Sequence, residues 1–292
     1  MAHKAGFVNI VGNPNVGKST LMNLLVGERI SIATFKAQTT RHRIMGILNT
    51  EDMQICFSDT PGVLKPNYKL QESMLNFSES ALQDADVLLY VTDMVETPDK
   101  NGDFLEKVSK MDVPVLLLIN KIDVSNQQEL TAKVEAWHAV LPKAEIIPIS
   151  ALEDQNVDTL ISTIKTYLNE GMMYYPKDQM TDHPERFVMA EFIREKILYF
   201  TREEVPHSVA IVVERMAELE DGSVEVIATI VVDRKSQKGI LIGKQGSMIK
   251  KIRQNAQREM KRFLQTTVHL ELFVKVENNW RNKQKYLKEF GY

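Results

Sequence analysis

Short apolar runs alternate with longer amphipathic stretches from residue 7 to about residue 168. The runs are rich in β-branched residues and apolar on both sides, which is typical of strands covered by helices on both faces. They predict six strands, at Phe7–Val11, Ile44–Asn49, Met53–Ser58, Val87–Thr92, Val115–Asn120 and Ile146–Ile149. The amphipathic stretches predict helices at Lys18–Val26, Leu70–Ala85, Asp103–Ser109, Gln127–Leu141 and Val157–Leu168. This alternation indicates an α/β domain with a mostly parallel sheet.

The alternation stops at residues 171–184, GMMYYPKDQMTDHP, which show neither a helical nor a strand period. Two prolines and a glycine there predict a linker, between a domain at residues 1–170 and another at residues 185–292. The second part predicts a helix at Arg186–Phe200, strands at Ser208–Arg215 and Val224–Asp233, two helices around Gly243–Gly246 and a strand at Val268–Val276. Because strands and helices are grouped here, a smaller α+β domain is favoured.

Charge separates the two parts of the chain more sharply than the net value of −3 suggests. From Arg234 to the end there are 15 Lys and Arg against 4 Glu, a net charge of +11, which leaves −14 for the preceding residues. Such asymmetry indicates a polyanion-binding module attached to a domain that does not bind polyanions through its surface charge.

Cysteine content and hydropathy restrict the setting of the protein. The single cysteine, Cys56, lies in a predicted buried strand, so no intrachain disulfide can form and an inert core thiol is expected. Only a few residues precede the first predicted strand, which leaves no room for a signal peptide. No apolar run approaches the ~20 residues of a membrane span. We therefore expect a cytoplasmic protein.

A loop with the pattern GxxxxGK[ST] follows the first predicted strand and precedes a helical run. Glycines let successive backbone N–H groups converge on a phosphate, and the helix N-terminus adds its positive end. Lys18 can reach the β- and γ-phosphates, and the Ser19 hydroxyl can coordinate Mg²⁺. A chance glycine turn seldom has this context. The pattern predicts a phosphate site formed by Gly12, Asn13, Pro14, Asn15, Val16, Gly17, Lys18, Ser19 and Thr20.

A DTPG turn closes the predicted strand Met53–Ser58. Asp59 stands where a magnesium-binding carboxylate is expected, acting through a water molecule. The Gly62 N–H can bond a γ-phosphate because no side chain intervenes. The turn is ordinary by itself, but with the phosphate loop it predicts further nucleotide contacts from Asp59, Thr60, Pro61, Gly62 and Val63.

An NKxD element follows the strand Val115–Asn120 and consists of Asn120, Lys121, Ile122 and Asp123. The Asp123 carboxylate can accept from N1–H and the exocyclic amine of guanine, whereas adenine has neither donor there. Such buried bonds reject the wrong partner by a factor of ~10⁴. Asn120 is expected to support the base and Lys121 to cover the ring. A later strand leads into three more candidates, Ser150, Ala151 and Leu152, and the Ala151 N–H can bond guanine O6. GTP and GDP are the predicted ligands.

Together these elements resemble the GTPases related to translation factors. The stretch KAQTTRHR at residues 36–43 and the C-terminal features below resemble the Era family of bacterial GTPases, over nearly the whole chain. The resemblance implies that QTTR is the first switch and that one threonine completes the Mg²⁺ shell. We expect Thr40, the one preceding Arg41, rather than Thr39. Lys18, Thr40, Asp59 and Gly62 are then the expected catalytic residues.

Val63 stands where the best-known small GTPases carry a glutamine that orients the attacking water. Valine cannot bond a water, so hydrolysis must rest on the backbone and the metal ion, with a further cation as one candidate contributor. Asn15 matches the asparagine with which members of this family bind potassium; it either does so here or only shapes the loop. We expect slow turnover.

A GxxG turn lies between two helical segments in the basic region. It matches the KH domain, in which two glycines admit a nucleic acid backbone while helix N-termini and lysines neutralise phosphates. The order of elements resembles the type II KH arrangement. A lone GxxG is weak evidence, but its apolar frame and basic sequel predict RNA contacts by Ile242, Gly243, Lys244, Gln245, Gly246, Lys250, Lys251, Arg253 and Arg258.

These residues alone fit single-stranded RNA or DNA. The family resemblance implies the 3′ end of 16S ribosomal RNA as the target and a role in assembly of the 30S subunit. We expect a monomer, although no sequence pattern determines the oligomeric state. The alternative is a GTPase whose C-terminal domain mainly recruits a protein or membrane partner in cell-cycle control, as a peripheral protein on the cytoplasmic face of the inner membrane. The basic and aromatic tail Trp280–Tyr292 is expected to be a frayed surface helix rather than an RNA or lipid contact.

Overall fold

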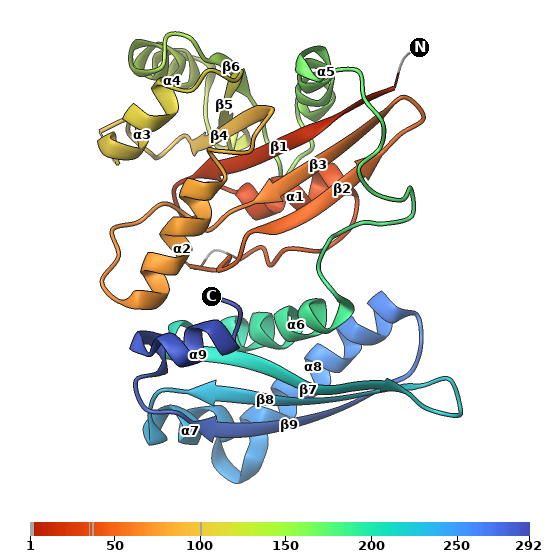
Figure 1. Cartoon of the computed structure of the whole chain (residues 1–292). Helices are drawn as coiled ribbons and strands as arrows, with labels where there is room; N and C mark the ends of the chain where they lie inside the picture. Colours follow the sequence, from red (N-terminus) through yellow and green to blue (C-terminus); the bar gives the residue numbers. More distant parts are fainter. Residues whose placement is uncertain (1–2, 35, 37, 100) are drawn as a thin grey trace. The chain divides into compact units, whose positions relative to one another are not determined.

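The computed structural model of the chain describes residues 3–34, 36, 38–99 and 101–292, so Ala37 of the KAQTTRHR stretch lies outside the described residues. It contains two compact units (Figure 1): Met1–Pro66 with Gln71–Asp182, and Asn67–Leu70 with His183–Tyr292. Each unit has a hydrophobic core of its own. Among the described residues, no helix combines the length and the apolar character that crossing a bilayer demands.

The first unit is built on a six-stranded sheet with the order β2-β3-β1-β4-β5-β6. β2 runs antiparallel to β3, and the other neighbours are parallel. The strands are β1 (Lys4–Gly12), β2 (Ile44–Asn49), β3 (Met53–Asp59), β4 (Val87–Asp93), β5 (Val115–Asn120) and β6 (Glu145–Pro148). This is the mostly parallel α/β sheet that the sequence predicts.

Helices pack on both faces of this sheet. Their bounds are α1 (Lys18–Val26), α2 (Lys69–Ser80), α3 (Gly102–Ser109), α4 (Gln127–Val140) and α5 (Val157–Tyr167). One core cluster joins α1 and α5 to the sheet, and another joins α3 and α4 to its opposite face. Along β4, Leu89 faces the first cluster while Leu88 and Tyr90 face the second. Burial on both faces explains why the strands are apolar throughout.

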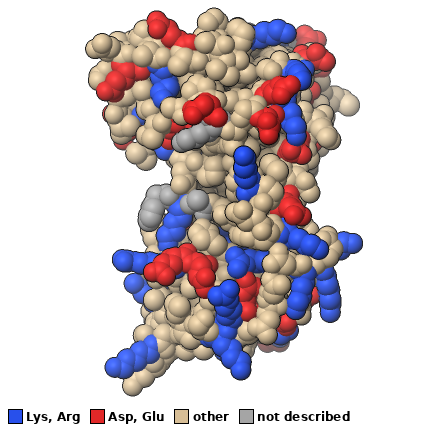
Figure 2. Space-filling view, turned by 90° about the vertical axis from the view of Figure 1, so that its left-hand side faces the viewer, with Lys and Arg blue, Asp and Glu red and all other residues tan. Residues whose placement is uncertain are grey.

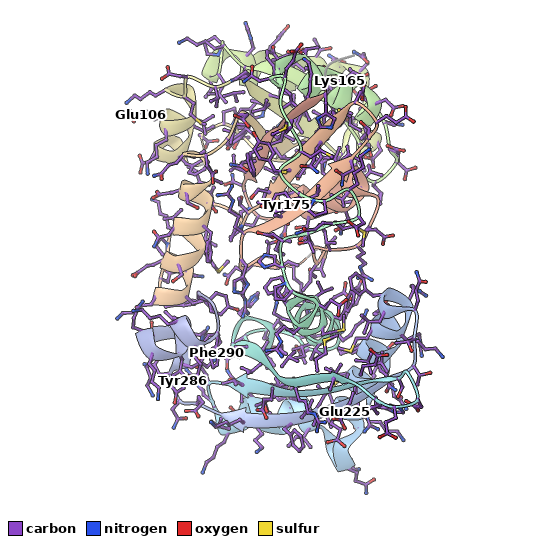
Figure 3. The ribbon with its side chains drawn as sticks, turned by 45° about the vertical axis from the view of Figure 1, so that its right-hand side comes forward. Glu106, Lys165, Tyr175, Glu225, Tyr286 and Phe290 are labelled. Carbon is purple, nitrogen blue, oxygen red and sulfur yellow. The ribbon has the colours of Figure 1, made fainter. Side chains whose placement is uncertain are left out.

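Residues within the predicted linker lie along the edge strand β2. The Ile47 N–H donates to the Met180 carbonyl at 2.9 Å. The fully buried Gln54 side chain accepts from the N–H groups of Tyr174 and Tyr175 at 2.6 and 3.0 Å and donates to the Tyr175 carbonyl at 2.8 Å; Figure 3 labels Tyr175 beside these strands. The Gln54 side chain, which lies on β3, thus satisfies backbone groups of Tyr174 and Tyr175.

The second unit has the order α6-β7-β8-α7-α8-β9. Its elements are α6 (Glu185–Phe200), β7 (Val209–Glu218), β8 (Val224–Val232), α7 (Lys235–Ile242), α8 (Ser247–Leu264) and β9 (Val268–Val276). β7 is antiparallel to β8, and β8 is parallel to β9. The three helices share one core with the sheet. This is the α+β arrangement that the sequence predicts for a type II KH domain.

The C-terminal tail corrects one expectation. It is not a frayed helix, because Trp280 is fully buried and its indole N–H donates to the Ser208 carbonyl at 2.9 Å. Arg281 is ion-paired with Asp233 at 2.7 Å. Both anchoring residues belong to the short helix η4 (Trp280–Asn282), and α9 (Gln284–Glu289) follows it. The rings of Tyr286 and Phe290, labelled in Figure 3, stack with their centroids 5.8 Å apart. The tail is therefore anchored to the second unit through the buried side chains of Trp280 and Leu287.

Candidate nucleotide and nucleic-acid sites

The phosphate loop connects the carboxyl end of β1 to α1. Gly12 has φ +143° and Gly17 has φ +97°, in the region that favours glycine. A Cβ at Gly12 would lie 2.1 Å from the Val91 carbonyl oxygen, and one at Gly17 would lie 2.2 Å from Nδ2 of Asn120. Both glycines are therefore required sterically as well as conformationally, and the backbone N–H groups between them are kept open for an anion.

Lys18 begins α1, and its side chain turns back into the loop. Its Nζ donates to the carbonyls of Gly12 at 3.1 Å and Asn13 at 2.8 Å, and the side chain is buried. Burial lowers the pKa of Lys18 from 10.5 to about 8, against the opposing attraction of Asp59 and Glu96. A phosphate at this position would supply the counter-charge that the buried ammonium needs.

This lowered pKa predicts that nucleotide binding takes up a proton at alkaline pH. In the free protein at pH 9, Lys18 with a pKa of about 8 is mostly neutral. Bound phosphates favour the ammonium, so the pKa rises on binding and close to one proton is taken up. Calorimetry of GDP binding in buffers of different ionisation enthalpy measures this uptake. A Lys18→Met variant should show none, whereas equal uptake by both proteins would contradict the assignment.

Three oxygen-bearing side chains converge beside the loop. The Ser19 hydroxyl donates to Oδ2 of Asp59 at 2.7 Å, and the Thr40 hydroxyl lies 2.8 Å from that of Ser19. Asp59 is fully buried, which raises the pKa of its carboxyl against the opposing effects of Lys18 and the neighbouring hydroxyls. Its other oxygen, Oδ1, has no hydrogen-bond partner among the described residues. A hard cation would provide that partner, so this oxygen set fits Mg²⁺.

The two threonines of the expected switch are placed differently. Thr40 also donates to Asp59 at 3.2 Å. Thr39 instead donates to the Lys36 carbonyl at 2.6 Å. The structure thus puts Thr40, rather than Thr39, beside the oxygen set.

The DTPG turn passes close to the phosphate loop. A Cβ at Gly62 would lie 2.6 Å from the backbone nitrogen of Pro14, so no side chain fits there. Val63 is buried, and its N–H donates to the Gly12 carbonyl at 3.1 Å. Thr60 donates to the Ile10 carbonyl at 2.8 Å. Thr60 and Val63 therefore hold the turn against β1 rather than project into the phosphate site.

The NKxD side chains connect their own loop to the phosphate loop. Asn120 donates to the Val16 carbonyl at 2.8 Å, and Nζ of Lys121 donates to the Asn15 carbonyl at 2.6 Å. The Lys121 stem thus spans the gap between the NKxD element and the phosphate loop. Asp123 is exposed and accepts from the Ser150 hydroxyl at 2.5 Å, which fixes its carboxylate at the rim. These positions suit recognition of a base beside the phosphates.

Not every predicted contact is free for a nucleotide. The Ala151 N–H already donates to Oδ1 of Asn120 at 2.9 Å, so guanine O6 would have to share or replace that acceptor. Leu152 is 75% exposed. Ile122 lies in the short 3₁₀ helix η1 (Ile122–Val124).

Two buried polar residues near the loop were not foreseen. Ser31 donates to Oδ2 of Asp59 at 2.6 Å, and it lies in a stretch that appears in the sequence only as a polar loop. Glu96 accepts from Nδ2 of Asn13 and, at 3.0 Å, from the Thr92 hydroxyl. Glu96 also lines a cavity of about 580 Å³, together with residues that include Asn13, Asn15, Asp93 and Lys121. No sequence motif marks either residue.

The GxxG turn has the backbone that close approach of a nucleic acid requires. Gly243, Gln245 and Gly246 have φ of +73°, +53° and +76°. A Cβ at Gly243 would lie 2.7 Å from that of Met248, whereas one at Gly246 would meet open space. Lys244 is exposed between the two glycines. The turn thus projects from the unit between α7 and α8.

A cavity of about 320 Å³ follows the turn, lined by Ile249, Lys250, Arg253, Glu271, Leu272 and Phe273. The exposed ring of Phe273 and the two cations suit stacking on a base and pairing with phosphates. Lys251 lies elsewhere, with Nζ 4.2 Å from the centre of the Phe200 ring. Arg258 and Ile242 do not line this cavity. Figure 2 shows many Lys and Arg side chains on the surface of the second unit.

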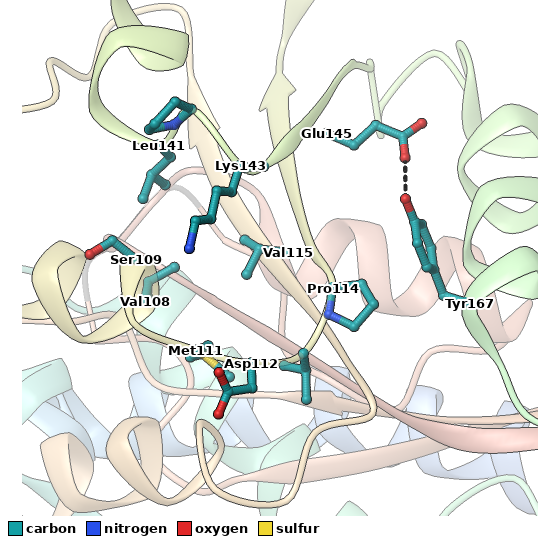
Figure 4. Close-up of a pocket in the computed structure, with 13 residues that line it drawn as sticks. Val108, Ser109, Met111, Asp112, Pro114, Val115, Leu141, Lys143, Glu145 and Tyr167 are labelled. Atoms are coloured by element: carbon teal, nitrogen blue, oxygen red, sulfur yellow. Dashed lines mark hydrogen bonds between the residues drawn. The ribbon is translucent and has the colours of Figure 1, made fainter.

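A further cavity, of about 500 Å³, lies at the amino ends of β5 and β6 (Figure 4). Its lining includes Val115 and Glu145, which begin β5 and β6, whereas the nucleotide candidates follow the carboxyl ends of the strands. Lys143 points into it, and the Tyr167 hydroxyl donates to Glu145 at 2.9 Å, which raises the pKa of that tyrosine. None of the predicted site residues lines it.

Comparisons with known proteins match both units. Residues 7–121 match the family described as 50S ribosome-binding GTPase, and residues 204–281 match the KH domain family. A crystal structure of Era in complex with MgGDPNP and nucleotides 1506–1542 of 16S ribosomal RNA is 39% identical over 99% of both chains, with a TM-score of 0.95. A variant of Era from Aquifex aeolicus bound to GDP and AlF4⁻ is 40% identical over 99% of both chains, also with a TM-score of 0.95.

Proposed function

The chain belongs to the Era family of GTPases. We therefore propose that its first unit binds GTP with Mg²⁺ and hydrolyses it, and that its second unit binds the 3′ end of 16S ribosomal RNA. The observation that carries the first part is the convergence of Ser19, Thr40 and Asp59 beside a glycine-bounded loop into which the Lys18 side chain turns back. The observation that carries the second is the exposed GxxG turn beside a basic, aromatic cavity.

Positioning and electrostatics account for hydrolysis at this site. Lys18 and the loop N–H groups would hold the β- and γ-phosphates, and the Gly62 N–H would bond the γ-phosphate. Ser19 and Thr40 would hold Mg²⁺ directly and Asp59 would hold it through a water molecule, and the bound ion neutralises charge on the phosphate oxygens. Val63 provides no group that orients a water, so we expect slow turnover.

We further propose that Asp123 selects guanine by accepting from N1–H and the exocyclic amine. The bond from Ser150 fixes the carboxylate, and Asn120 links the base loops to the phosphate loop. Because the carboxylate is already fixed, little side-chain entropy is lost when the base binds.

A potassium ion near the phosphates is the cation that we propose for the missing catalytic charge. Asn15 is exposed with φ +67°, and no described residue is hydrogen-bonded to its side chain. Its amide oxygen is therefore available as a ligand. GTP hydrolysis should be faster in potassium than in sodium, and an Asn15→Ala variant should lose the difference. Equal rates of the wild type in both salts would remove the cation from the mechanism.

The RNA target and a role in 30S assembly are supported by the 16S ribosomal RNA that one related Era structure contains. The direct test measures RNA affinity with GDP and with a GTP analogue bound, and nucleotide affinity with and without a 16S 3′-end oligonucleotide. Thermodynamic linkage requires that the GTP analogue, relative to GDP, changes RNA affinity by the same factor by which RNA changes the affinity for the analogue relative to that for GDP. No binding of that oligonucleotide, together with binding to anionic vesicles, would favour the alternative of a membrane partner.

A further inference from the structure

Asp59 accepts hydrogen bonds from three hydroxyls on the same oxygen. Oδ2 lies 2.6 Å from Ser31, 2.7 Å from Ser19 and 3.2 Å from Thr40, whereas Oδ1 has no partner among the described residues. Ser19 and Thr40 are the proposed metal ligands. Ser31 is the additional donor, and its bond is the shortest of the three. It fixes which oxygen of the carboxylate remains open.

Ser31 is itself held by one side chain of α1. Oδ1 of Asn23 accepts from the N–H groups of Ser31 at 2.9 Å and Ile30 at 3.1 Å, and its Nδ2 donates to the Ser31 carbonyl at 2.8 Å. Asn23 follows Ser19 by four residues, so both side chains lie on the same face of α1. The helix that supplies the Ser19 ligand therefore also fixes Ser31.

The surroundings of Ser31 make it a rigid support. Ser31 is 2% exposed, and its neighbours Ile30 and Ile32 are 4% and 5% exposed. The stretch that ends in Thr40 thus begins at a buried point that three hydrogen bonds fix to α1. A buried hydroxyl with a fixed backbone can hold a carboxylate in one orientation, as the outer partners of metal ligands do.

We propose that Asn23 and Ser31 form a clamp that orients the Asp59 carboxylate for Mg²⁺, with Ser31 as a positioning residue rather than a ligand. This inference rests on the proposed function of Asp59. It predicts that loss of the Ser31 hydroxyl weakens Mg²⁺ binding about 10- to 100-fold, the usual effect of removing an outer partner of a metal ligand. It also predicts that nucleotide binding without Mg²⁺ is unaffected.

The test measures release of a fluorescent GDP analogue from the full chain as Mg²⁺ is increased. In the wild type, Mg²⁺ should slow release. In Ser31→Ala, the Mg²⁺ concentration for half-maximal slowing should rise at least about tenfold, while the release rate in EDTA stays within about twofold. The matched control, Ser109→Ala, removes an exposed hydroxyl of α3 and should leave both quantities unchanged.

A second variant keeps the proposal testable if Ser31→Ala does not fold. Asn23→Asp keeps the acceptor for both N–H groups but loses the donor to the Ser31 carbonyl, so the half-maximal Mg²⁺ concentration should rise here as well. Unchanged Mg²⁺ dependence in the folded variants, or faster release by the same factor with and without Mg²⁺, would overturn the clamp. If the rate of GDP-analogue release from the wild type does not depend on Mg²⁺, the proposed function of Asp59 is contradicted instead.

Discussion

Replacing Lys18 by methionine is expected to lower kcat/KM for GTP hydrolysis by roughly 10²–10³-fold, the usual cost of losing one preorganised charge donor. Methionine keeps most of the apolar stem but has no ammonium. The buried Nζ bonds only the Gly12 and Asn13 carbonyls in the described residues, so its loss removes little from the fold. A steady-state phosphate-release assay measures the change.

Lys143→Met provides the matched control for this variant. Lys143 is an exposed lysine in the cavity at the amino ends of β5 and β6, away from the phosphate loop. Its replacement should leave hydrolysis unchanged. Thermal unfolding of both variants tests whether they remain folded. A folded Lys18→Met variant with wild-type kcat/KM would show that the ammonium has no part in the transition state.

Gly246→Asp is expected to weaken RNA binding roughly 100-fold, while Gly246→Asn weakens it much less. Gly246 has φ +76°, which Asp and Asn tolerate better than other non-glycine residues, and a Cβ there meets open space. The two variants therefore share size and backbone strain and differ in one charge. A carboxylate about 6 Å from a phosphate costs about 3 kcal/mol at an effective dielectric of 20.

Fluorescence anisotropy with a labelled 16S 3′-end oligonucleotide measures both affinities. The difference between the variants should shrink as salt is raised, because screening acts on the charge and not on the shape. Equal weakening by Asp and Asn would mean that the turn contributes shape alone. Wild-type affinity of both variants would place the RNA elsewhere on the molecule.

Much of the fold is predictable from the sequence because burial repeats along each element. α1, β2, β5 and β9 have the predicted bounds, since their apolar patterns end where polar or glycine residues begin. Long-range side-chain contacts are not predictable in this way. The Gln54 contacts to Tyr174 and Tyr175 join residues about 120 positions apart, and no local pattern encodes them. The burial of Trp280 against Ser208 was missed for the same reason.

In the candidate site, too, residues of local motifs are predictable from the sequence, whereas residues that act through long-range contacts are not. Gly12, Lys18 and Asp59 belong to motifs whose residue types follow from phosphate and metal chemistry, so the sequence indicates them directly. Ser31 and Glu96 act through neighbours that only the fold brings near, and neither belongs to a motif. In the second unit, Lys250 and Arg253 line the cavity, whereas Lys251 faces Phe200 because consecutive residues of α8 point in different directions. A run of basic residues alone does not reveal that separation.

The most direct test of the account is competition of GTP and ATP for the purified protein in the presence of Mg²⁺, against a fluorescent GDP analogue. GTP is expected to compete roughly 10⁴-fold better than ATP, because adenine has no donors at the positions where guanine N1–H and the exocyclic amine donate to the Asp123 carboxylate. An Asp123→Ala variant should lose most of that preference. Equal competition by ATP and GTP in the wild type would contradict the claim that Asp123 selects the base of a nucleotide held by Lys18.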